Sequence, residues 1–141
     1  MKETSSGGIV FRRQGEKVFF LLLHYKYKSD YWSFTRGNMK ESEDVVDTAK
    51  REIFEESDLT KLNFIDGFKE KTKFIYTKDG RKVYKNITIF LVETNQKDVT
   101  VSHEHVGFDW LEFDAALERL KFKNDKEVLT KANQFLIASS S

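Results

Sequence analysis

The chain has 141 residues and a formal net charge of +1, with 39% hydrophobic and 33% charged residues. This composition is typical of one soluble globular domain, which would span residues 1–141. The near-neutral charge gives no indication of DNA or membrane binding, and no apolar run approaches the ~20 residues of a membrane span. Because the chain contains no Cys, disulfide scaffolds, thiolate zinc sites and cysteine nucleophiles are excluded. We therefore expect a cytoplasmic protein that is a monomer or a weak dimer.

The N-terminal part of the chain predicts two strands, at Ile9–Arg12 and Val18–Tyr25. The second contains five consecutive apolar residues, Phe19–Leu23, which is typical of a strand buried on both faces. A short aromatic strand is predicted at Tyr31–Phe34, and the polar segment Thr35–Ser42 that follows it is predicted to be a loop.

A helical period follows this loop. Apolar residues recur at helical spacing from Glu43 to Ser57. Ser42 is the expected N-cap, and the acidic residues that follow it suit the positive end of a helix dipole. The segment is therefore predicted to be a helix with one face in the core.

The C-terminal half predicts more strands and then helices. Leu62–Thr77 and Val83–Thr94 are predicted as strands around Lys78–Arg81, where Asp-Gly is a strong hairpin signal. The remaining predicted elements are a polar loop at Ser102–Gly107, a strand at Phe108–Phe113, and helices at Asp114–Leu120 and Asp125–Ala138. This order predicts an α/β domain whose mixed sheet is covered by helices on both faces.

A cluster of carboxylates marks the predicted helix at 43–57. Glu52, Glu55 and Glu56 stand at positions i, i+3 and i+4, so they share one helix face. Three like charges repel one another unless a cation lies among them, and hard oxygen ligands suit Mg²⁺ or Mn²⁺. Arg51 can orient a neighbouring carboxylate through a forked hydrogen bond. The alternative is a solvated acidic face whose charge Lys50 and Arg51 relieve.

The residues around this cluster resemble the signature of the Nudix family, G-x5-E-x7-R-E-U-x-E-E-x-G-U, in which U is aliphatic. The matching positions are Gly37, Glu43, Arg51, Glu52, Ile53, Glu55, Glu56 and Leu59. The final Gly is replaced by Asp58, which tolerates the left-handed backbone that ends such a helix at a cost of ~1 kcal/mol. The many fixed positions make this motif specific.

A wider resemblance, to the asymmetrical diadenosine tetraphosphate hydrolases, covers nearly the whole chain. The segments that carry it are Gly8–Arg13, Phe20–Leu23, Gly67–Lys69, Ser102–His105, Trp110–Leu111, Phe122–Lys123 and Gln134–Leu136. One departure precedes the signature, where Phe34–Asn38 stands in place of Pro-Pro-Lys-Gly-His. Arg36 keeps the positive charge there, whereas Asn38 replaces a His that is expected near the substrate.

The family resemblance implies the Nudix α/β/α sandwich and a metal-dependent pyrophosphohydrolase. It assigns the metal, Mg²⁺ with Mn²⁺ as a substitute, to a set of oxygen ligands: Gly37, Glu52, Glu55, Glu56 and Glu104. Glu55 or Glu52 is the favoured general base, and Glu104 is the rival. Arg51 is expected to position Glu52.

Substrate binding requires cations for the phosphates and flat apolar faces for a base. The expected cations are Arg36, Lys69 and Lys85, and the expected aromatic residues are Phe74, Tyr76 and Tyr84. His103 can reach a phosphate, although a hydrogen bond that orders its loop is the commoner role of such a residue. For the aromatic residues and the two Lys, core packing or ordinary surface exposure is the competing interpretation.

Three functions agree with the sequence. The first is cleavage of diadenosine tetraphosphate to ATP and AMP, so the expected partner is a small-molecule nucleotide. The second keeps the chemistry but acts on RNA 5′ ends or on nucleoside diphosphate derivatives, because one fold hosts many substrates. The third is a catalytically silent module that only binds nucleotides. The complete set of signature carboxylates argues against this third function.

Overall fold

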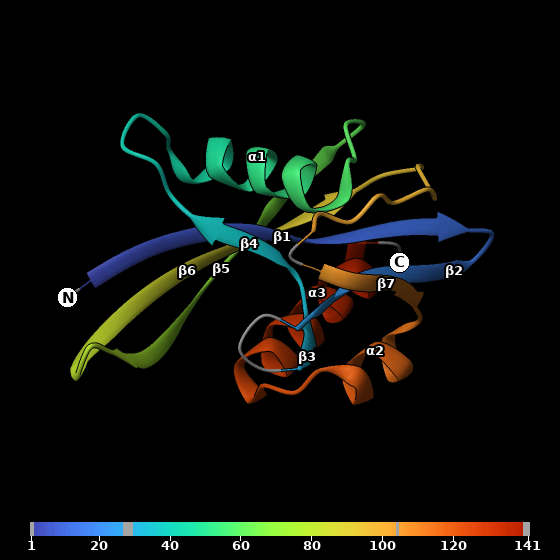
Figure 1. Ribbon diagram of the computed structural model, residues 1–141. Helices are drawn as coiled ribbons and strands as arrows, with labels where there is room; N and C mark the ends of the chain where they lie inside the picture. Colours follow the sequence, from blue (N-terminus) through green and yellow to red (C-terminus); the bar gives the residue numbers. More distant parts are fainter. Residues whose placement is uncertain (1, 27–29, 104, 140–141) are drawn as a thin grey trace.

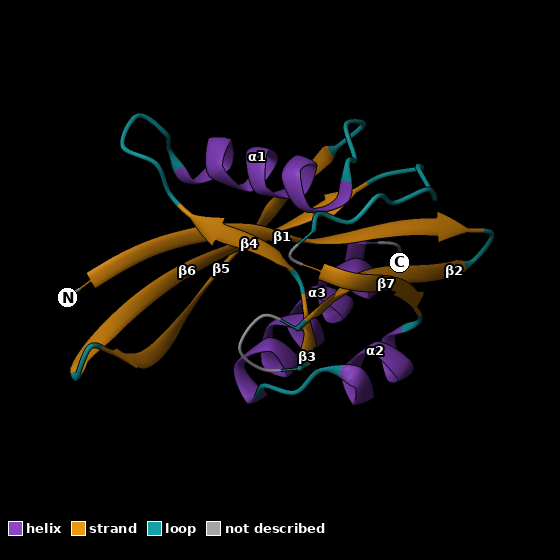
Figure 2. Cartoon of the chain, in the orientation of Figure 1, coloured by secondary structure: helices purple, strands orange, loops and turns teal. Residues whose placement is uncertain are grey.

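The computed structural model describes residues 2–26, 30–103 and 105–139. In this part of the chain it contains seven strands and three helices, which are shown in Figures 1 and 2. The strands are β1 (Lys2–Gln14), β2 (Lys17–Tyr25), β3 (Tyr31–Ser33), β4 (Thr35–Asn38), β5 (Asn63–Lys78), β6 (Arg81–Glu93) and β7 (His105–Leu111). The helices are α1 (Val45–Ser57), α2 (Phe113–Arg119) and α3 (Lys123–Ser139).

The strands form one mixed sheet in which β1 is central. Strand β1 runs parallel to β6 along most of its length and antiparallel to β2 and β4 on its other side. Strands β5 and β6 form a long antiparallel hairpin, in which β5 is the outer strand. Strand β2 also pairs with β3 and β7. This sheet confirms the predicted mixed topology.

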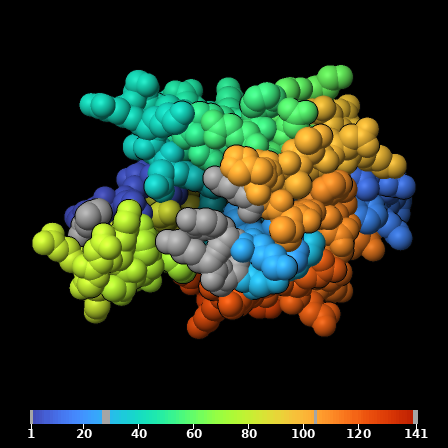
Figure 3. Space-filling model, in the orientation of Figure 1, coloured from blue at the N-terminus to red at the C-terminus, as the bar shows by residue number. Residues whose placement is uncertain are grey.

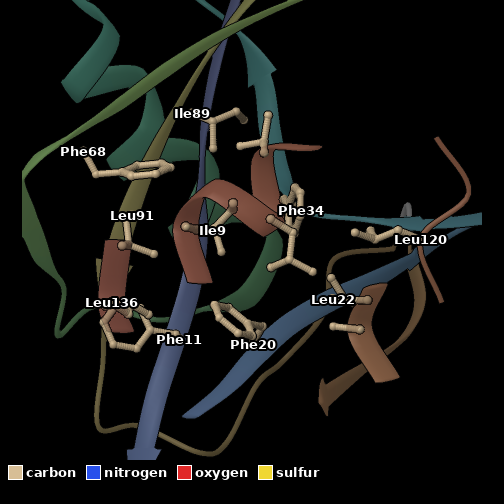
Figure 4. Close-up of a cluster of buried hydrophobic side chains, with 14 of the residues drawn as sticks. Ile9, Phe11, Phe20, Leu22, Phe34, Phe68, Ile89, Leu91, Leu120 and Leu136 are labelled. Carbon is tan, nitrogen blue, oxygen red and sulfur yellow. The ribbon is translucent and has the colours of Figure 1, made fainter. Parts of the chain in front are cut away.

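Helices cover both faces of the sheet, as expected for the sandwich, and Figure 1 shows α1 on one side and α2 and α3 on the other. The core under α1 contains Val10, Leu21 and Ile53, all almost fully buried. The core under α3 is larger and contains Phe11, Phe20 and Leu136, which Figure 4 shows together. Burying such side chains stabilises the fold by about 1.5–3 kcal/mol each.

Two predicted strand boundaries were wrong because the pairing is not local. Strand β1 begins at Lys2 instead of Ile9, since Lys2–Phe11 pairs in parallel with Tyr84–Glu93. Thr35–Asn38, predicted as loop, forms β4 by pairing with Ser5–Gly8. A short polar segment can become a strand whenever a distant strand offers free backbone groups.

Helix α1 begins two residues later than predicted, and its N-cap is Asp44 instead of Ser42. The Asp44 carboxylate accepts a hydrogen bond from the Asp47 N–H at 2.8 Å, and the two residues form a capping box. At the other end, Asp58 adopts the left-handed conformation with φ 64°. The predicted tolerance of Asp at this position is therefore confirmed.

The other local predictions agree with the structure except at one loop. Asp79 and Gly80 both have positive φ, as the predicted hairpin turn requires. The predicted loop at Ser102–Gly107 instead enters β7 at His105, which pairs with Tyr25. No helix in the described part of the chain is both long and apolar enough to span a membrane.

Candidate active site

Arg51 is the centre of a carboxylate network on α1. Its Nε and Nη2 donate to the two oxygens of Glu43 at 2.6 and 3.0 Å, the paired geometry that makes guanidinium–carboxylate contacts strong. Its Nη1 donates to Glu52 at 2.7 Å and to Glu55 at 3.1 Å. Its Nη2 also donates to the backbone carbonyl of Asn38 at 2.9 Å. One side chain therefore fixes the loop before α1 and the acidic face of α1.

Glu43 is held in the ionised state by this network. The pKa of Glu43 is lowered to about 2, mainly by the hydrogen bond from Arg51 and next by the hydrogen bond from the backbone N–H of Lys40. Its oxygen also accepts a hydrogen bond from the Thr48 hydroxyl at 3.1 Å. The Glu43 carboxylate is thus used to anchor the loop, as expected for a structural role.

Glu52 lies directly against Gly37 of β4. A Cβ atom at position 37 would lie 2.1–2.3 Å from the Glu52 carboxyl atoms, far inside van der Waals contact. Only a residue without a side chain lets the carboxylate approach this backbone. The position of the Glu52 carboxylate therefore requires glycine at position 37.

Glu56 is a buried carboxylate beside Glu52, with 5% of its surface exposed. It accepts hydrogen bonds from the backbone N–H of Arg36 at 3.2 Å and from the Tyr25 hydroxyl at 3.3 Å. Burial, and then the charge of Glu52, raise its pKa well above 4.5. Burial also raises the pKa of Tyr25, so this phenol keeps its proton and remains a donor. A buried group with a shifted pKa is typical of a functional site.

This shift predicts how stability depends on pH. The folded protein binds the Glu56 proton more tightly than the unfolded chain, so the free energy of unfolding should fall as pH rises from about 4.5 towards the raised pKa. Glu56→Gln should lack this component. Urea unfolding of both proteins in chelator, at steps from pH 4.5 to 8, measures the difference. Parallel pH curves would contradict the prediction.

The carboxylates of α1 are chemically suited to a hard divalent cation, although their side chains do not converge on a single point. Among the described residues, no three acidic or histidine side chains form a cluster that could hold a metal ion. Glu52 is nevertheless close enough to Glu56 for its charge to raise the pKa of Glu56, and the Gly37 backbone adjoins Glu52. Glu55 is turned towards Arg51 and is about half exposed. These oxygen ligands fit Mg²⁺ or Mn²⁺.

A second network lies beneath β4. The Arg36 guanidinium donates from Nη1 to Asp125 at 3.1 Å, and the Ser33 hydroxyl donates to the other Asp125 oxygen at 2.6 Å. Asp125 is in the first turn of α3 and is 4% exposed. Because a buried ion pair is costly to break, this contact fixes Arg36 and the start of α3 relative to each other.

An aromatic cavity of about 230 Å³ adjoins Arg36. It is lined by Phe74 of β5, by Phe122, and by the Arg36–Asp125 pair. The two Phe rings meet edge to face with their centroids 6.0 Å apart, a favourable geometry for aromatic pairs. Tyr31 supports Phe122 from the other side at 5.1 Å. The cavity therefore has a flat apolar wall and a cation.

The predicted substrate-binding residues divide between the two faces of the β5–β6 hairpin. Phe74 pairs across the strands with Lys85, and Tyr76 packs beside Phe74 at 6.1 Å. Lys85 lies within electrostatic range of Arg36 and Glu52, and burial lowers its pKa. Tyr84 alternates with Lys85 and therefore points to the opposite face.

Lys69 was also expected in the cleft, and the structure places it on that opposite face together with Tyr84. Both residues are exposed and do not share the face of the hairpin that carries Phe74, so their role in substrate binding stays a prediction. His103 is exposed in the turn before β7. Glu104, expected as a metal ligand or base, lies outside the described residues.

Several residues of the site were missed in the sequence, namely Tyr25, Tyr31, Ser33, Phe122 and Asp125. Tyr25, Phe122 and Asp125 are far along the chain from the helix that carries the carboxylates, whereas Tyr31 and Ser33 immediately precede β4. His105, which contacts the Tyr25 ring at 4.4 Å, lies in a stretch that the wider resemblance had marked. Phe122 also lay in such a stretch, which was the only available signal for it.

Comparison with known proteins agrees with this geometry. The family model of the NUDIX domain matches residues 1–132. The chain belongs to the Nudix family. It is similar to the asymmetrical bis(5′-nucleosyl)-tetraphosphatase of Sus scrofa, with 30% identity over 96% of both chains. The Caenorhabditis elegans protein of the same name is 28% identical over 94% of this chain and 95% of its own.

Solved structures support the same assignment to the Nudix hydrolases. A crystal structure of a C. elegans Ap4A hydrolase binary complex has 27% identity and a TM-score of 0.85, covering 96% of this chain and 98% of that chain. The E. coli dihydroneopterin triphosphate pyrophosphohydrolase has 18% identity and a TM-score of 0.77, over 91% and 92% of the two chains. The second likeness concerns the fold alone.

Proposed function

We propose that this Nudix hydrolase cleaves a pyrophosphate bond of dinucleoside polyphosphates, converting diadenosine tetraphosphate to ATP and AMP. The observation that carries the proposal is that Arg36 contacts two parts of the site, one through its backbone and the other through its side chain. Its backbone N–H donates to the buried carboxylate of Glu56, and its side chain lines the aromatic cavity. A base in the cavity would therefore place its phosphates beside the carboxylates of α1.

The carboxylates of α1 supply the metal ligands in this proposal, since Nudix hydrolases generally use a divalent metal. Glu52 and Glu56, with the Gly37 carbonyl, would hold Mg²⁺ or Mn²⁺, and Glu55 would complete the set. When bound there, such a metal would neutralise phosphate charge and lower the pKa of the attacking water. Arg51 keeps Glu52 and Glu55 in place through its hydrogen bonds.

Proton transfer is assigned to Glu55. Arg51 donates to both carboxylates, but Glu52 is packed against Gly37 with 14% of its side chain exposed, whereas 48% of the Glu55 side chain is exposed. A half-exposed carboxylate can take a proton from water and release it to solvent. The water oxygen then forms a bond to phosphorus as the bridging P–O bond breaks, and the released nucleotide carries the leaving oxygen.

The volume of the aromatic cavity suits a single nucleobase. Its volume of about 230 Å³ is below the ~300 Å³ of sites that enclose drug-sized ligands, so the sugar and phosphates would lie outside it. The Phe74 ring, 38% exposed, offers a face for stacking. Arg36 lines the cavity, and Lys85 is within electrostatic range of Arg36 and Glu52. Both could therefore stabilise the charge that develops on the phosphate chain.

A substrate panel tests the proposed function. The protein is incubated with diadenosine tetraphosphate, a 5′-triphosphorylated RNA oligomer and an ADP-sugar, each with Mg²⁺ and with chelator. We expect metal-dependent release of ATP and AMP from the dinucleotide at the highest kcat/KM. Faster cleavage of the RNA end would replace the proposed substrate, and no cleavage of any compound would leave only a nucleotide-binding role.

Removing the aromatic wall should weaken substrate binding more than chemistry. For Phe122→Ala we expect KM for diadenosine tetraphosphate to rise about tenfold, because stacking on an aromatic ring contributes about 1–3 kcal/mol per base. Phe122→Tyr keeps the ring face and should keep KM near the wild-type value. Initial rates over a substrate series give both constants. An unchanged KM in Phe122→Ala would remove the base from this cavity.

A further inference from the structure

A row of lysines stands on the face of β5 opposite the aromatic cavity. Lys69, Lys71 and Lys73 alternate along the strand and therefore share one face of the sheet. All three are exposed. Within the described residues, none of the three forms an ion pair with an acidic side chain. The net charge of +1 thus conceals a local concentration of positive charge.

These lysines line a groove of about 430 Å³ beside the first turn of α1. The other lining residues are uncharged: Thr4, Thr72, Asn86 and Thr88 are polar, and Val45 and Ile87 are apolar. No acidic residue among those described lines the groove. Hydroxyl and amide groups can donate hydrogen bonds to an anion that the ammonium groups attract.

An exposed aromatic ring extends the same face. Tyr84 is 47% exposed and lies directly opposite Ile75, which is 57% exposed, on the neighbouring strand. Both follow Lys73 towards the tip of the hairpin, on the same side of the sheet. The hairpin stands out from the body of the molecule in Figures 1 and 3. The face therefore combines a basic row with a ring that is open to stacking.

Protection of the sheet edge explains only part of this arrangement. Strand β5 is at the end of the strand order, and exposed edges often carry Lys to prevent pairing with other chains. Protection of an edge requires charged side chains, but it does not require that all the charges on one face of the strand have the same sign. The opposite face of β5 carries Glu70, paired with Lys131 at 3.0 Å, and the uncharged Thr72. The segregation of charge indicates an anionic partner.

We propose that this face, formed by Lys69, Lys71, Lys73 and Tyr84, binds single-stranded nucleic acid. Side chains on one face of a strand repeat at about 6.6 Å, a spacing comparable to that of successive phosphates in an extended strand. Three ammonium groups can thus follow the backbone while a base stacks on Tyr84, the combination used by sequence-tolerant single-strand binders. The face lies on the α1 side of the sheet, beside Val45, and opposite the side that carries Phe74 of the aromatic cavity.

The test compares two triple variants in which three exposed lysines become Gln. K69Q/K71Q/K73Q removes the row, and K17Q/K61Q/K97Q removes the same charge elsewhere on the surface. Fluorescence anisotropy with a labelled 12-nucleotide oligouridylate is measured from 25 to 200 mM salt. We expect the row variant to lose affinity at least about tenfold and to lower the salt slope by about 2, since each phosphate contact on a single strand contributes about 0.7. The control should keep most of the affinity.

Tyr84 provides a second measurement that charge alone does not affect. Tyr84→Ala should weaken binding at least about fivefold, and Tyr84→Phe should not, because only the ring face is needed. Diadenosine tetraphosphate hydrolysis is measured separately on the same variants, because Lys73 also lines the aromatic cavity; a change in hydrolysis would bear on the proposed function and not on the affinity for the oligomer. Equal losses in both triple variants, or no binding by the wild type at 25 mM salt, would overturn the proposal. Binding to phosphatidylserine vesicles but not to the oligomer would replace it with a membrane partner.

Discussion

Glu56→Gln should lower kcat for diadenosine tetraphosphate hydrolysis by at least about 100-fold, because metal-borne charge stabilisation supplies several kcal/mol of the barrier reduction. Glu56 is the carboxylate most deeply placed in the site, and it is bonded to the Arg36 backbone and to Tyr25. Gln has the same shape but lacks the charge that a divalent cation requires. Single-turnover rates at saturating Mg²⁺ measure the loss.

Stability separates this functional effect from a folding defect. Since burial and Glu52 raise the pKa of Glu56, its ionised form is unfavourable in the absence of metal at neutral pH. The Tm of Glu56→Gln in chelator at pH 8 should therefore equal or exceed that of the wild type. Glu118→Gln, on the exposed surface of α2, is the matched control and should change neither quantity. Near wild-type turnover by Glu56→Gln would mean that the metal site is assigned to the wrong residues.

The parts of the site that could be predicted are those whose residues all belong to one helix. Glu52, Glu55 and Glu56 share a face because of helical periodicity alone, and Arg51 lies close enough to bond to two of them. Asp58 was predicted to end the helix from its own backbone preference, and the structure has it at φ 64°. Such features depend on residues that are close together in the sequence, so they can be predicted from the sequence alone.

The parts that could not be predicted depend on residues far apart along the chain. The Arg36–Asp125 pair joins positions separated by 89 residues, and no local pattern distinguishes Asp125 from an ordinary helix-start acid. Strand β4 exists only because β1 is paired with it. In contrast, the opposite orientation of Tyr84 and Lys85 could have been predicted, since adjacent residues of a strand point to opposite faces.

The same distinction explains why Arg51 matters beyond its charge. Its guanidinium joins Glu43, two carboxylates of the site and the Asn38 carbonyl, so it connects the loop before α1 to the catalytic face. A lysine at this position keeps the charge but offers one nitrogen in place of a planar fork. It cannot donate to all four partners in their present positions.

Arg51→Lys should therefore lower kcat by about 100-fold while KM changes little, because a displacement of about 1 Å in a catalytic group can reduce the rate by this factor. Arg51 is not among the described residues that line the aromatic cavity, so substrate affinity should be retained. Arg13→Lys makes the same substitution at the Arg13–Glu93 surface pair, 3.3 Å long, and should leave kcat unchanged, since exposed pairs contribute about 0–1 kcal/mol. If Arg51→Lys instead raised KM and kept kcat, Arg51 would act on substrate binding. If both variants were unaffected, charge alone would be sufficient to organise the carboxylates of α1.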